Sequence, residues 1–301
     1  MWGSVMPNNE FYFAVTVDDV ALQGWYSESN FRKLLSFFDE EKVKATFFVV
    51  PVDEETDRPF NEVFPELPEI IREARQNGHA FGQHGIRHNR FELGIPPAMV
   101  LDLPHETENK RFAETHKAEL DAQHTKENCL KRLKYGRDIL EKGLGFAVKG
   151  FRAPAAQTSD GMFAALREAY DFDSSTCFQE TGWDYLLDKL DVPPRELDRE
   201  RWEKITSVNP GKEFPGSCDY TWFLPSERYD ITMKLAKHDL DACIALDVPF
   251  VTVSHVDPVF NGEGIRFLKE LFQYAKEKAK AEGKELVFAN LETIAAKYNV
   301  R

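Results

Sequence analysis

The sequence predicts an α/β fold organised around a parallel sheet, either as a barrel or as an open sheet. Short apolar runs alternate with helical patterns along the whole chain, and βα units produce that order. The 301 residues are enough for one α/β barrel or for two domains of average size. Since no repeat, low-complexity segment or Gly/Ser-rich linker divides the chain, we expect a single domain over residues 1–301.

Short apolar or β-rich runs are expected to form the strands. The first, residues 11–17, is almost entirely apolar, as a strand buried on both faces would be. The other predicted strands are residues 45–50, 79–82, 146–151, 171–175, 250–254 and 286–289.

Helical patterns occupy the segments between these runs. Ser29 is expected to cap the first helix, whose apolar face includes Phe31 and Phe38. The Asn77-Gly78 pair is expected to stop the second helix. The predicted helices are residues 29–41, 67–76, 104–140, 159–168, 227–246, 264–282 and 291–298.

Two stretches between predicted strands are unusually long, residues 89–145 and 177–249. We expect both to be insertions over one face of the sheet rather than a second domain. Residues 214–223, within the second stretch, are aromatic and rich in Pro and Gly. They are expected to form either a wall of the substrate site or a packed surface loop.

Composition limits the partners and the compartment of this protein. The formal net charge of −13 argues against nucleic acid and against an anionic membrane surface, because both require basic patches. The four cysteines are widely spaced, so neither a zinc knuckle nor a disulfide framework is indicated. No apolar run is long enough to span a bilayer, and residues 1–8 lack the pattern of a secretory signal. We therefore expect a cytoplasmic protein; its oligomeric state stays open.

Two adjacent carboxylates, Asp18 and Asp19, close the first predicted strand. Neighbouring residues on a regular strand point to opposite sides, so the two acids should not share one role. At an irregular strand end, both could reach one pocket, one as a metal ligand and the other as a base. The alternative is a solvated turn, since Asp is common where strands end.

Two histidines, His84 and His88, follow the third predicted strand at a spacing of four. On a helical turn, this spacing places both side chains on one face, where they can chelate one metal ion. Imidazole suits zinc, nickel, iron or cobalt, and two histidines with one carboxylate leave positions open for water and substrate. The alternative is a pair of incidental surface histidines.

Arg152 and His255 each stand at the end of a predicted strand. Parallel barrels carry their catalytic groups at such ends. An arginine there can orient a carboxylate through paired hydrogen bonds, and a histidine can act as an acid or a base. A surface ion pair and a buried structural histidine are the alternatives. Together with the Asp pair and the two earlier histidines, these residues indicate a site assembled from several βα loops.

The motifs and their order resemble the polysaccharide deacetylase family, also described as NodB-homology proteins or carbohydrate esterase family 4. The resemblance covers about residues 13–296, and the combination is more specific than any single motif. The motifs are Thr-x-Asp-Asp at 16–19, Lys-Ala-Thr-Phe-Phe-Val at 44–49, Asn-Gly-His-x-x-Gly-x-His-x-x-x-His at 77–88, Phe-Arg-x-Pro at 151–154, Asp-Ser-Ser at 173–175 and a late histidine on a strand.

The resemblance implies a distorted (β/α)7–8 barrel that binds one divalent metal. Zinc is the first expectation, with cobalt, nickel, iron(II) or manganese as alternatives. Asp19, His84 and His88 match the metal ligands of the family. The implied reaction removes the N-acetyl group from an acetylated sugar, either a polysaccharide, an oligosaccharide or a sugar-lipid precursor. Without an export signal, a small or lipid-linked N-acetyl sugar is the more plausible substrate.

The resemblance also implies catalytic roles for other positions. Asp18 looks like the general base, and Arg152 looks like the residue that holds it in place. His255 looks like the general acid. The backbone N–H of Ala155 matches the donor that stabilises the oxyanion beside the metal.

The sequence departs from the family pattern in several places. Val20 stands where glycine usually follows the Asp pair, and Gly85 stands where Ser or Thr usually follows the first histidine. The Asp-Trp pair whose carboxylate supports the catalytic histidine is missing after the Asp-Ser motif, and Asp173 is the expected substitute. Residues 89–94 lie outside the common pattern and should either contact substrate or pack.

Two other functions are compatible with the scaffold. One is a different amide hydrolase, such as a ureide ring-opening enzyme; relatives of this kind that work without metal have lost metal ligands. The other is an inactive carbohydrate-binding relative, which has no need of a base and an acid such as Asp18 and His255.

Overall fold

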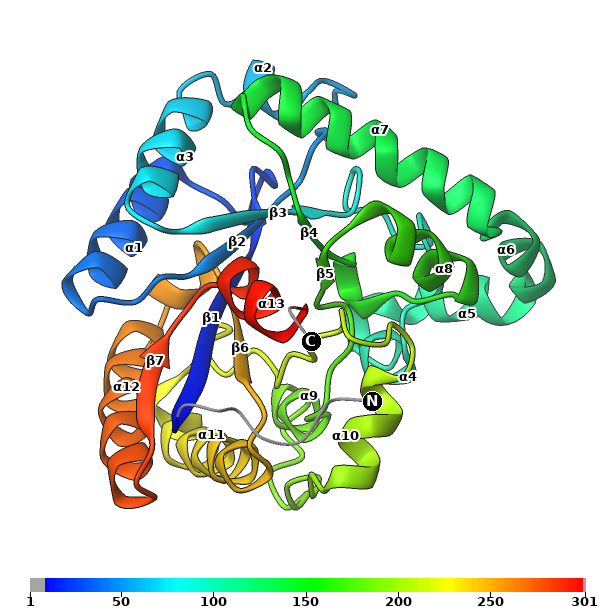
Figure 1. Ribbon diagram of the computed structural model, residues 1–301. Coiled ribbons are helices and arrows are strands. Elements are labelled where there is room, and N and C mark those ends of the chain that lie inside the picture. The colour runs from blue at the N-terminus through cyan, green and yellow to red at the C-terminus, as the bar shows by residue number, and fades with distance from the viewer. Residues whose placement is uncertain (1–8, 300–301) are drawn as a thin grey trace.

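A curved parallel sheet forms the centre of the computed structural model, which describes residues 9–299 (Figure 1). Residues 1–8, on which the expectation about export rests, lie outside this range. All pairings between strands are parallel, in the order β5-β4-β3-β2-β1-β6, and β7 pairs with the first part of β1. The strands are β1 (Glu10–Val20), β2 (Thr46–Val49), β3 (Ala80–His84), β4 (Gly150–Arg152), β5 (Phe172–Asp173), β6 (Phe250–His255) and β7 (Glu285–Phe288).

Helices surround the sheet, so the fold is the distorted α/β barrel that the family resemblance implied (Figure 1). The short helices α2, α4, α9 and α10 were not predicted. The helices are α1 (Glu28–Glu40), α2 (Phe60–Val63), α3 (Leu67–Gln76), α4 (Ala98–Leu101), α5 (Thr107–Thr115), α6 (Lys117–Gln123), α7 (Lys126–Leu144), α8 (Asp160–Ala169), α9 (Thr181–Leu186), α10 (Arg199–Thr206), α11 (Ser226–Leu246), α12 (Gly264–Ala281) and α13 (Leu291–Asn299).

Most predicted elements are confirmed, but some boundaries are not. The cap of α1 is Ser27 rather than Ser29. The helix predicted over residues 104–140 is broken at His116 and His124, so that α5, α6 and α7 follow one another. The Thr125 side chain accepts a hydrogen bond from the backbone N–H of Asn128 and thereby starts α7 as a new helix. The strand predicted over 146–151 is limited to β4.

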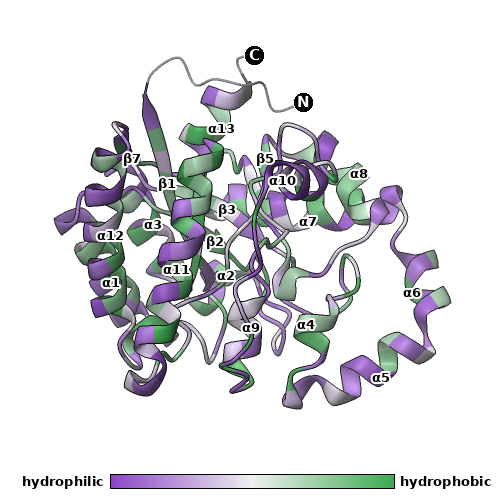
Figure 2. Cartoon of the chain, turned by 90° about the horizontal axis from the view of Figure 1, so that it is seen from below, coloured by the Kyte–Doolittle hydropathy of each residue, from purple (hydrophilic) through white to green (hydrophobic). Residues whose placement is uncertain are grey.

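The alternation of side chains along β1 creates two cores. Phe11, Phe13 and Val15 belong to the large core between the sheet and the outer helices. Tyr12 and Ala14 point into the barrel and join a second core that includes residues of α13. Figure 2 shows α13 at one end of the barrel, with α4 and α9 at the other. The barrel is therefore filled and closed at the α13 end, which leaves the opposite end available for a site.

A segment of the second insertion completes the barrel between β5 and β6. Residues 213–219 are buried or nearly so and form parallel bridges from Glu213 to Asp173 and from Asp219 to Val253. The backbone N–H of Ser217 donates to the carbonyl of Val251 on β6 at 2.8 Å. This segment therefore takes the place of a missing strand, and its first part is a packed element rather than an exposed loop.

The large core contains residues of both insertions, such as Leu133 and Trp202, beside residues of the sheet such as Phe151. Both insertions therefore share one core with the sheet. Within residues 9–299, no helix combines the length and the apolar character that a membrane span requires.

Candidate active site

The C-terminal ends of the strands meet at the end of the barrel away from α13, and the predicted site residues gather there (Figure 2). Asp18 belongs to β1, His84 ends β3, Arg152 ends β4 and His255 ends β6. All of them line one cavity of about 560 Å³, together with Ala155. The assembly of the site from several strand ends is the arrangement that the sequence indicated.

The end of β1 is irregular, and this brings both carboxylates of the Asp pair to the cavity. The register of β1 against β2 shifts between Val17 and Val20, and Asp19 is left-handed with a φ of 61°. Asp18 keeps its register opposite His255. Val20 is buried and lies outside the left-handed region. Because Asp19 adopts the left-handed conformation itself, valine is compatible with the turn at position 20.

Asp19, His84 and His88 form a cluster that could hold one metal ion. One donor atom from each lies within 4.8 Å of the other two. The Nε2 atoms of His84 and His88 are 3.2 Å and 3.1 Å from Asp19 Oδ1. The expected helical turn is wrong: the chain curls through Gly85 (φ 57°) and His88 (φ 64°) in left-handed conformations. This curl, rather than a helical face, turns both rings toward Asp19.

The donors of this cluster fit a cation. His84 Nδ1 lies 3.0 Å from the carbonyl oxygen of Arg152, which can only accept, so Nδ1 carries the hydrogen and Nε2 presents a lone pair. His84 Nε2 and Asp19 Oδ1 are buried and lack a hydrogen-bond partner among the described residues. Two imidazoles and one carboxylate are a donor set that zinc accepts, with positions left for water and substrate.

The electrostatics of the cluster favour positive charge. Burial opposes ionisation of Asp19, but His88 and His255 outweigh burial and hold its pKa well below the usual range. Burial also opposes the charge on His84, but Asp18 and Asp19 outweigh it and raise the pKa of His84. A proton or a metal ion can supply this positive charge.

Arg152 connects Asp18 to neighbouring strands. Its Nη1 donates to Asp18 Oδ1 at 2.9 Å and to Thr16 Oγ1 at 2.6 Å. Its Nε and Nη2 donate to the carbonyl and the hydroxyl oxygen of Ser174 at 2.8 Å and 2.6 Å. The guanidinium also lies 4.5 Å from the centre of the Phe48 ring. Because the buried arginine is held from several sides, it fixes the orientation of the Asp18 carboxylate.

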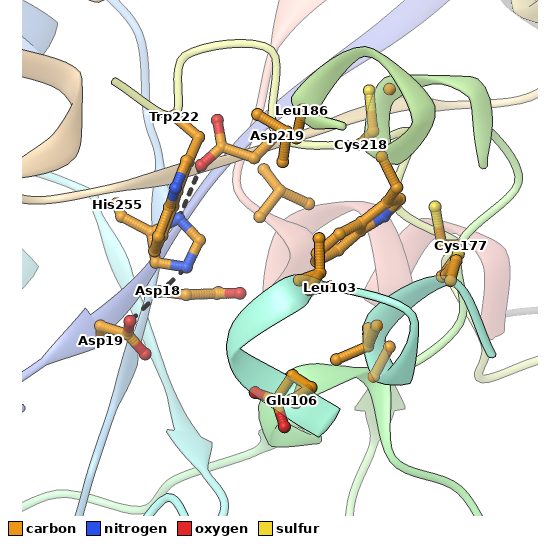
Figure 3. Close-up of a pocket in the computed structure, with 18 of the residues that line it drawn as sticks. Asp18, Asp19, Leu103, Glu106, Cys177, Leu186, Cys218, Asp219, Trp222 and His255 are labelled. Atoms are coloured by element: carbon orange, nitrogen blue, oxygen red, sulfur yellow. Dashed lines mark hydrogen bonds and ion pairs between the residues drawn. The ribbon is translucent and has the colours of Figure 1, made fainter. Parts of the chain in front are cut away.

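Asp219 supports His255, and the sequence did not reveal it. Asp219 Oδ2 lies 2.7 Å from His255 Nδ1, while Oδ1 accepts from the backbone N–H and the hydroxyl of Thr221, each at 2.7 Å. The Trp222 ring packs edge-on against the imidazole at 4.6 Å (Figure 3). An Asp and a Trp thus flank the histidine, but they stand three positions apart within the second insertion. The Asp-Tyr-Thr-Trp sequence inside the aromatic segment was the available signal.

The expectation that Asp173 supports His255 is wrong. Asp173 is buried and turned toward Ser175, whose hydroxyl donates to its Oδ1 at 2.5 Å. Burial and the nearby Glu213 carboxyl raise the pKa of Asp173 well above its usual range. The Ser175 oxygen in turn accepts from the backbone N–H of Ala153 at 3.0 Å. Residues 213–219 lie between β5 and β6 and keep Asp173 away from His255. Through Ser175, Asp173 fixes the backbone near Arg152.

The loop at residues 89–94 packs against the backbone that follows His84. The carboxylate of Glu92 accepts from the backbone N–H groups of Ile86 and Arg87 at 2.8 Å and 3.0 Å. A Cβ at Gly85 would lie 2.0 Å from Glu92 Oε1 and 2.4 Å from Pro154 Cγ. Glu92 therefore fixes the backbone of the motif, and only glycine at position 85 leaves room for it.

Gly85→Ser, which introduces the residue type common in the family, is expected to destabilise the fold by about 2–4 kcal/mol. A left-handed residue with a Cβ costs about 1–2 kcal/mol, and overpacking adds about 1–3 kcal/mol. Urea unfolding of the metal-free protein measures this loss. Gly24→Ser is the matched control, because Gly24 has a φ of 83° and nothing within 4 Å of an added Cβ. Equal losses in both variants would contradict the packing of Glu92 against Gly85.

Comparison with known proteins connects this site to one family. Residues 6–170 match the model of a family described as polysaccharide deacetylase. This stretch includes Asp18, Asp19, His84, His88 and Arg152, and it ends before Asp219 and His255. No curated protein matches the sequence significantly.

Solved structures share the fold at low sequence identity. A provisionally named polysaccharide deacetylase from Mycobacterium smegmatis is 17% identical, with a TM-score of 0.59 over 98% of this chain and 93% of its own. A family 4 acetyl xylan esterase from Clostridium thermocellum, in complex with cobalt, is 15% identical, with a TM-score of 0.48 over 94% and 89% of the two chains. A carbohydrate esterase family 4 pseudoenzyme from Bacillus anthracis is 12% identical, with a TM-score of 0.48 over 96% and 66%.

Proposed function

Because the chain belongs to the polysaccharide deacetylase family, we propose that it is a metal-dependent hydrolase that removes the N-acetyl group from an acetylated sugar. One observation carries this proposal. One cavity is lined by three features. They are the cluster of donors that could bind a metal, the Asp18 carboxylate held by Arg152, and the His255 imidazole held by Asp219. These three groups supply what the hydrolysis of an amide requires, since water must be activated and the leaving amine protonated.

We assign the metal to Asp19, His84 and His88. A divalent cation bound there, zinc in the first place, would lower the pKa of water and polarise the amide oxygen. The hydrogen bond from His84 Nδ1 to the Arg152 carbonyl selects one tautomer of the imidazole. In this tautomer Nε2 is free to bind the metal.

The protein's own groups move the protons. Asp18, oriented by Arg152, accepts a proton from the attacking water, whose oxygen bonds to the acetyl carbon. The backbone N–H of Ala155 is assigned to donate to the carbonyl oxygen as negative charge develops. His255 gives its proton to the nitrogen as the C–N bond breaks. The products are acetate and the free amino sugar.

The environment of His255 suits an acid. Burial lowers the pKa of His255, but Asp19 and Asp219 outweigh burial and raise it to about 9. The contact with Asp219 therefore favours the protonated imidazole, which the leaving nitrogen requires.

Asp219→Asn is expected to lower kcat/KM about 10²–10⁴-fold and to shift the alkaline limb of the pH profile to lower pH. A neutral amide no longer stabilises the imidazolium, so the pKa of His255 falls and the acid form is lost earlier as the pH rises. Acetate release measured across the pH range provides the profile. Asp188→Asn, on the exposed rim of the same cavity, should leave the profile unchanged. An unchanged alkaline limb in the Asp219 variant would contradict the role of this pair.

A screen of acetylated sugars and nucleotide sugars for acetate release tests the function directly. The zinc-loaded and the metal-free protein are compared with each substrate. Release that depends on added metal supports the proposal. Metal-loaded protein that releases no acetate but opens cyclic ureides would overturn it in favour of the other amide hydrolase.

A further inference from the structure

Beyond the catalytic groups, the cavity wall is built mainly from apolar side chains of the two insertions. The first insertion contributes Val100 and Leu103, and the second contributes Trp183, Leu186 and Trp222. Figure 3 shows Leu103, Leu186 and Trp222 around the same space as Asp18. These side chains are only partly covered by the protein itself, apart from Val100, which is buried. They therefore present an apolar surface to whatever enters beside the catalytic groups.

The two insertions also meet at the site. Helix α4 of the first insertion contacts helix α9 of the second, and residues of both helices line the cavity. This contact closes one side of the site, whereas a long glycan needs a trough that is open at both ends. Its volume of about 560 Å³ lies within the range of sites for compact organic ligands.

Two polar groups in this wall, Glu106 and Arg228, are engaged within the protein, whereas Asp188 and His105 stand exposed at its rim. Glu106 is buried and accepts from Arg90 at 2.5 Å and from Asn109 at 2.7 Å. Arg228 donates to the carbonyl of Tyr185 at 2.9 Å. The lining of this cavity, within the described part of the chain, contains no Asn, Gln or Lys. Few free donors and acceptors remain for the hydroxyl groups of additional sugar rings.

We propose that the substrate is a compact molecule that carries an apolar group next to the hydrolysed amide, and that Leu103, Trp183, Leu186 and Trp222 bind this group. The inference rests on the proposed function, because the amide carbonyl must lie at the catalytic groups while the apolar group reaches the insertions. The apolar group sits either on the amine side of the amide, so that acetate is still released, or on the acyl side, so that a longer acyl group takes the place of acetyl. A phenyl ring or a short alkyl chain would displace water from this wall and gain about tenfold in affinity or more.

The first test measures binding and does not require turnover. Calorimetry on the zinc-loaded chain of 301 residues compares acetohydroxamate with 4-phenylbutanohydroxamate, which share the metal-binding group and differ in the apolar part. If the apolar group lies on the acyl side, the phenyl compound binds at least about tenfold more tightly. Leu186→Asn should reduce this advantage to less than about threefold, and Leu103→Asn, from the other insertion, should do the same.

The second test examines the amine side by hydrolysis. Acetate release is compared for the methyl and the phenyl β-glycosides of N-acetylglucosamine and for the chitin hexamer. If the apolar group lies on the amine side, kcat/KM is at least about tenfold higher for the phenyl glycoside, and the hexamer is the poorest substrate. Leu190→Asn is the matched control, because Leu190 is an exposed leucine just beyond α9 that does not line the cavity. It should leave both preferences unchanged.

The outcomes separate this inference from the proposed function. An apolar preference on either side that depends on Leu186 supports the inference. Equal binding and equal hydrolysis within each pair, or a preference for the hexamer, overturns it while the deacetylase function stands. Failure to release acetate from any sugar while the phenyl hydroxamate still binds more tightly counts against the proposed function alone.

Discussion

Asp18→Asn is expected to lower acetate release about 10²–10⁴-fold while the protein keeps its metal. The amide is nearly isosteric with the carboxylate, but it does not accept a proton from the attacking water. The metal donors are on Asp19, His84 and His88, so their geometry should persist. Arg152 remains anchored by Thr16 and Ser174, which limits rearrangement of the site.

Two measurements on the purified variant test this expectation. Elemental analysis should find the same metal content as in the wild type, and a coupled acetate assay should find the loss of turnover. Asp53→Asn is the matched control, because Asp53 is a buried carboxylate outside the cavity that is held by Gln23 and Thr56. Its activity should stay near that of the wild type. Unchanged turnover in the Asp18 variant would remove this residue as the base.

His84→Ala is expected to lose the metal, and activity with it. The wild type should contain about one metal ion per chain, because one cluster of three donors is found among residues 9–299. Removal of one imidazole leaves two donors, a set that structural and catalytic zinc sites do not use. A metal that binds only the folded state also stabilises it, so added zinc should raise the Tm of the wild type but not of the variant.

The thermal shift gives this prediction a readout that is independent of catalysis. His116→Ala is the control, because His116 is an exposed histidine between α5 and α6, outside the cluster. It should keep both the metal and the zinc-dependent rise in Tm. Retention of a full equivalent of metal by the His84 variant would refute the ligand assignment.

Local patterns were enough to predict most of the barrel. A strand such as residues 11–17 is recognisable because burial on both faces leaves an apolar run. Helix α3 was predicted with its observed bounds, since Asn77 and Gly78 end it through local geometry. The helix predicted over residues 104–140 failed because its charged pattern continues across His116 and His124, where the backbone turns away from the helix.

The sequence by itself determined the groups at the strand ends. Asp18, Asp19, His84 and Arg152 each follow a buried run directly, so the parallel strand order fixes their common location. It also determined the order of motifs from which the family can be identified. These are local features, because hydrophobic pattern and turn residues act over a few positions of the chain.

Only the tertiary structure decided which distant groups complete the site. Asp219 pairs with His255 because residues 213–219 enter the gap between β5 and β6, and Glu92 reaches the backbone beside Gly85 because glycine leaves room for it. The contact of α4 with α9 creates the apolar wall in the same way. Each pairing joins segments that are separated by a loop. The length of such a loop does not determine which residues meet. Packing across the fold selects such partners, and no local pattern encodes that selection.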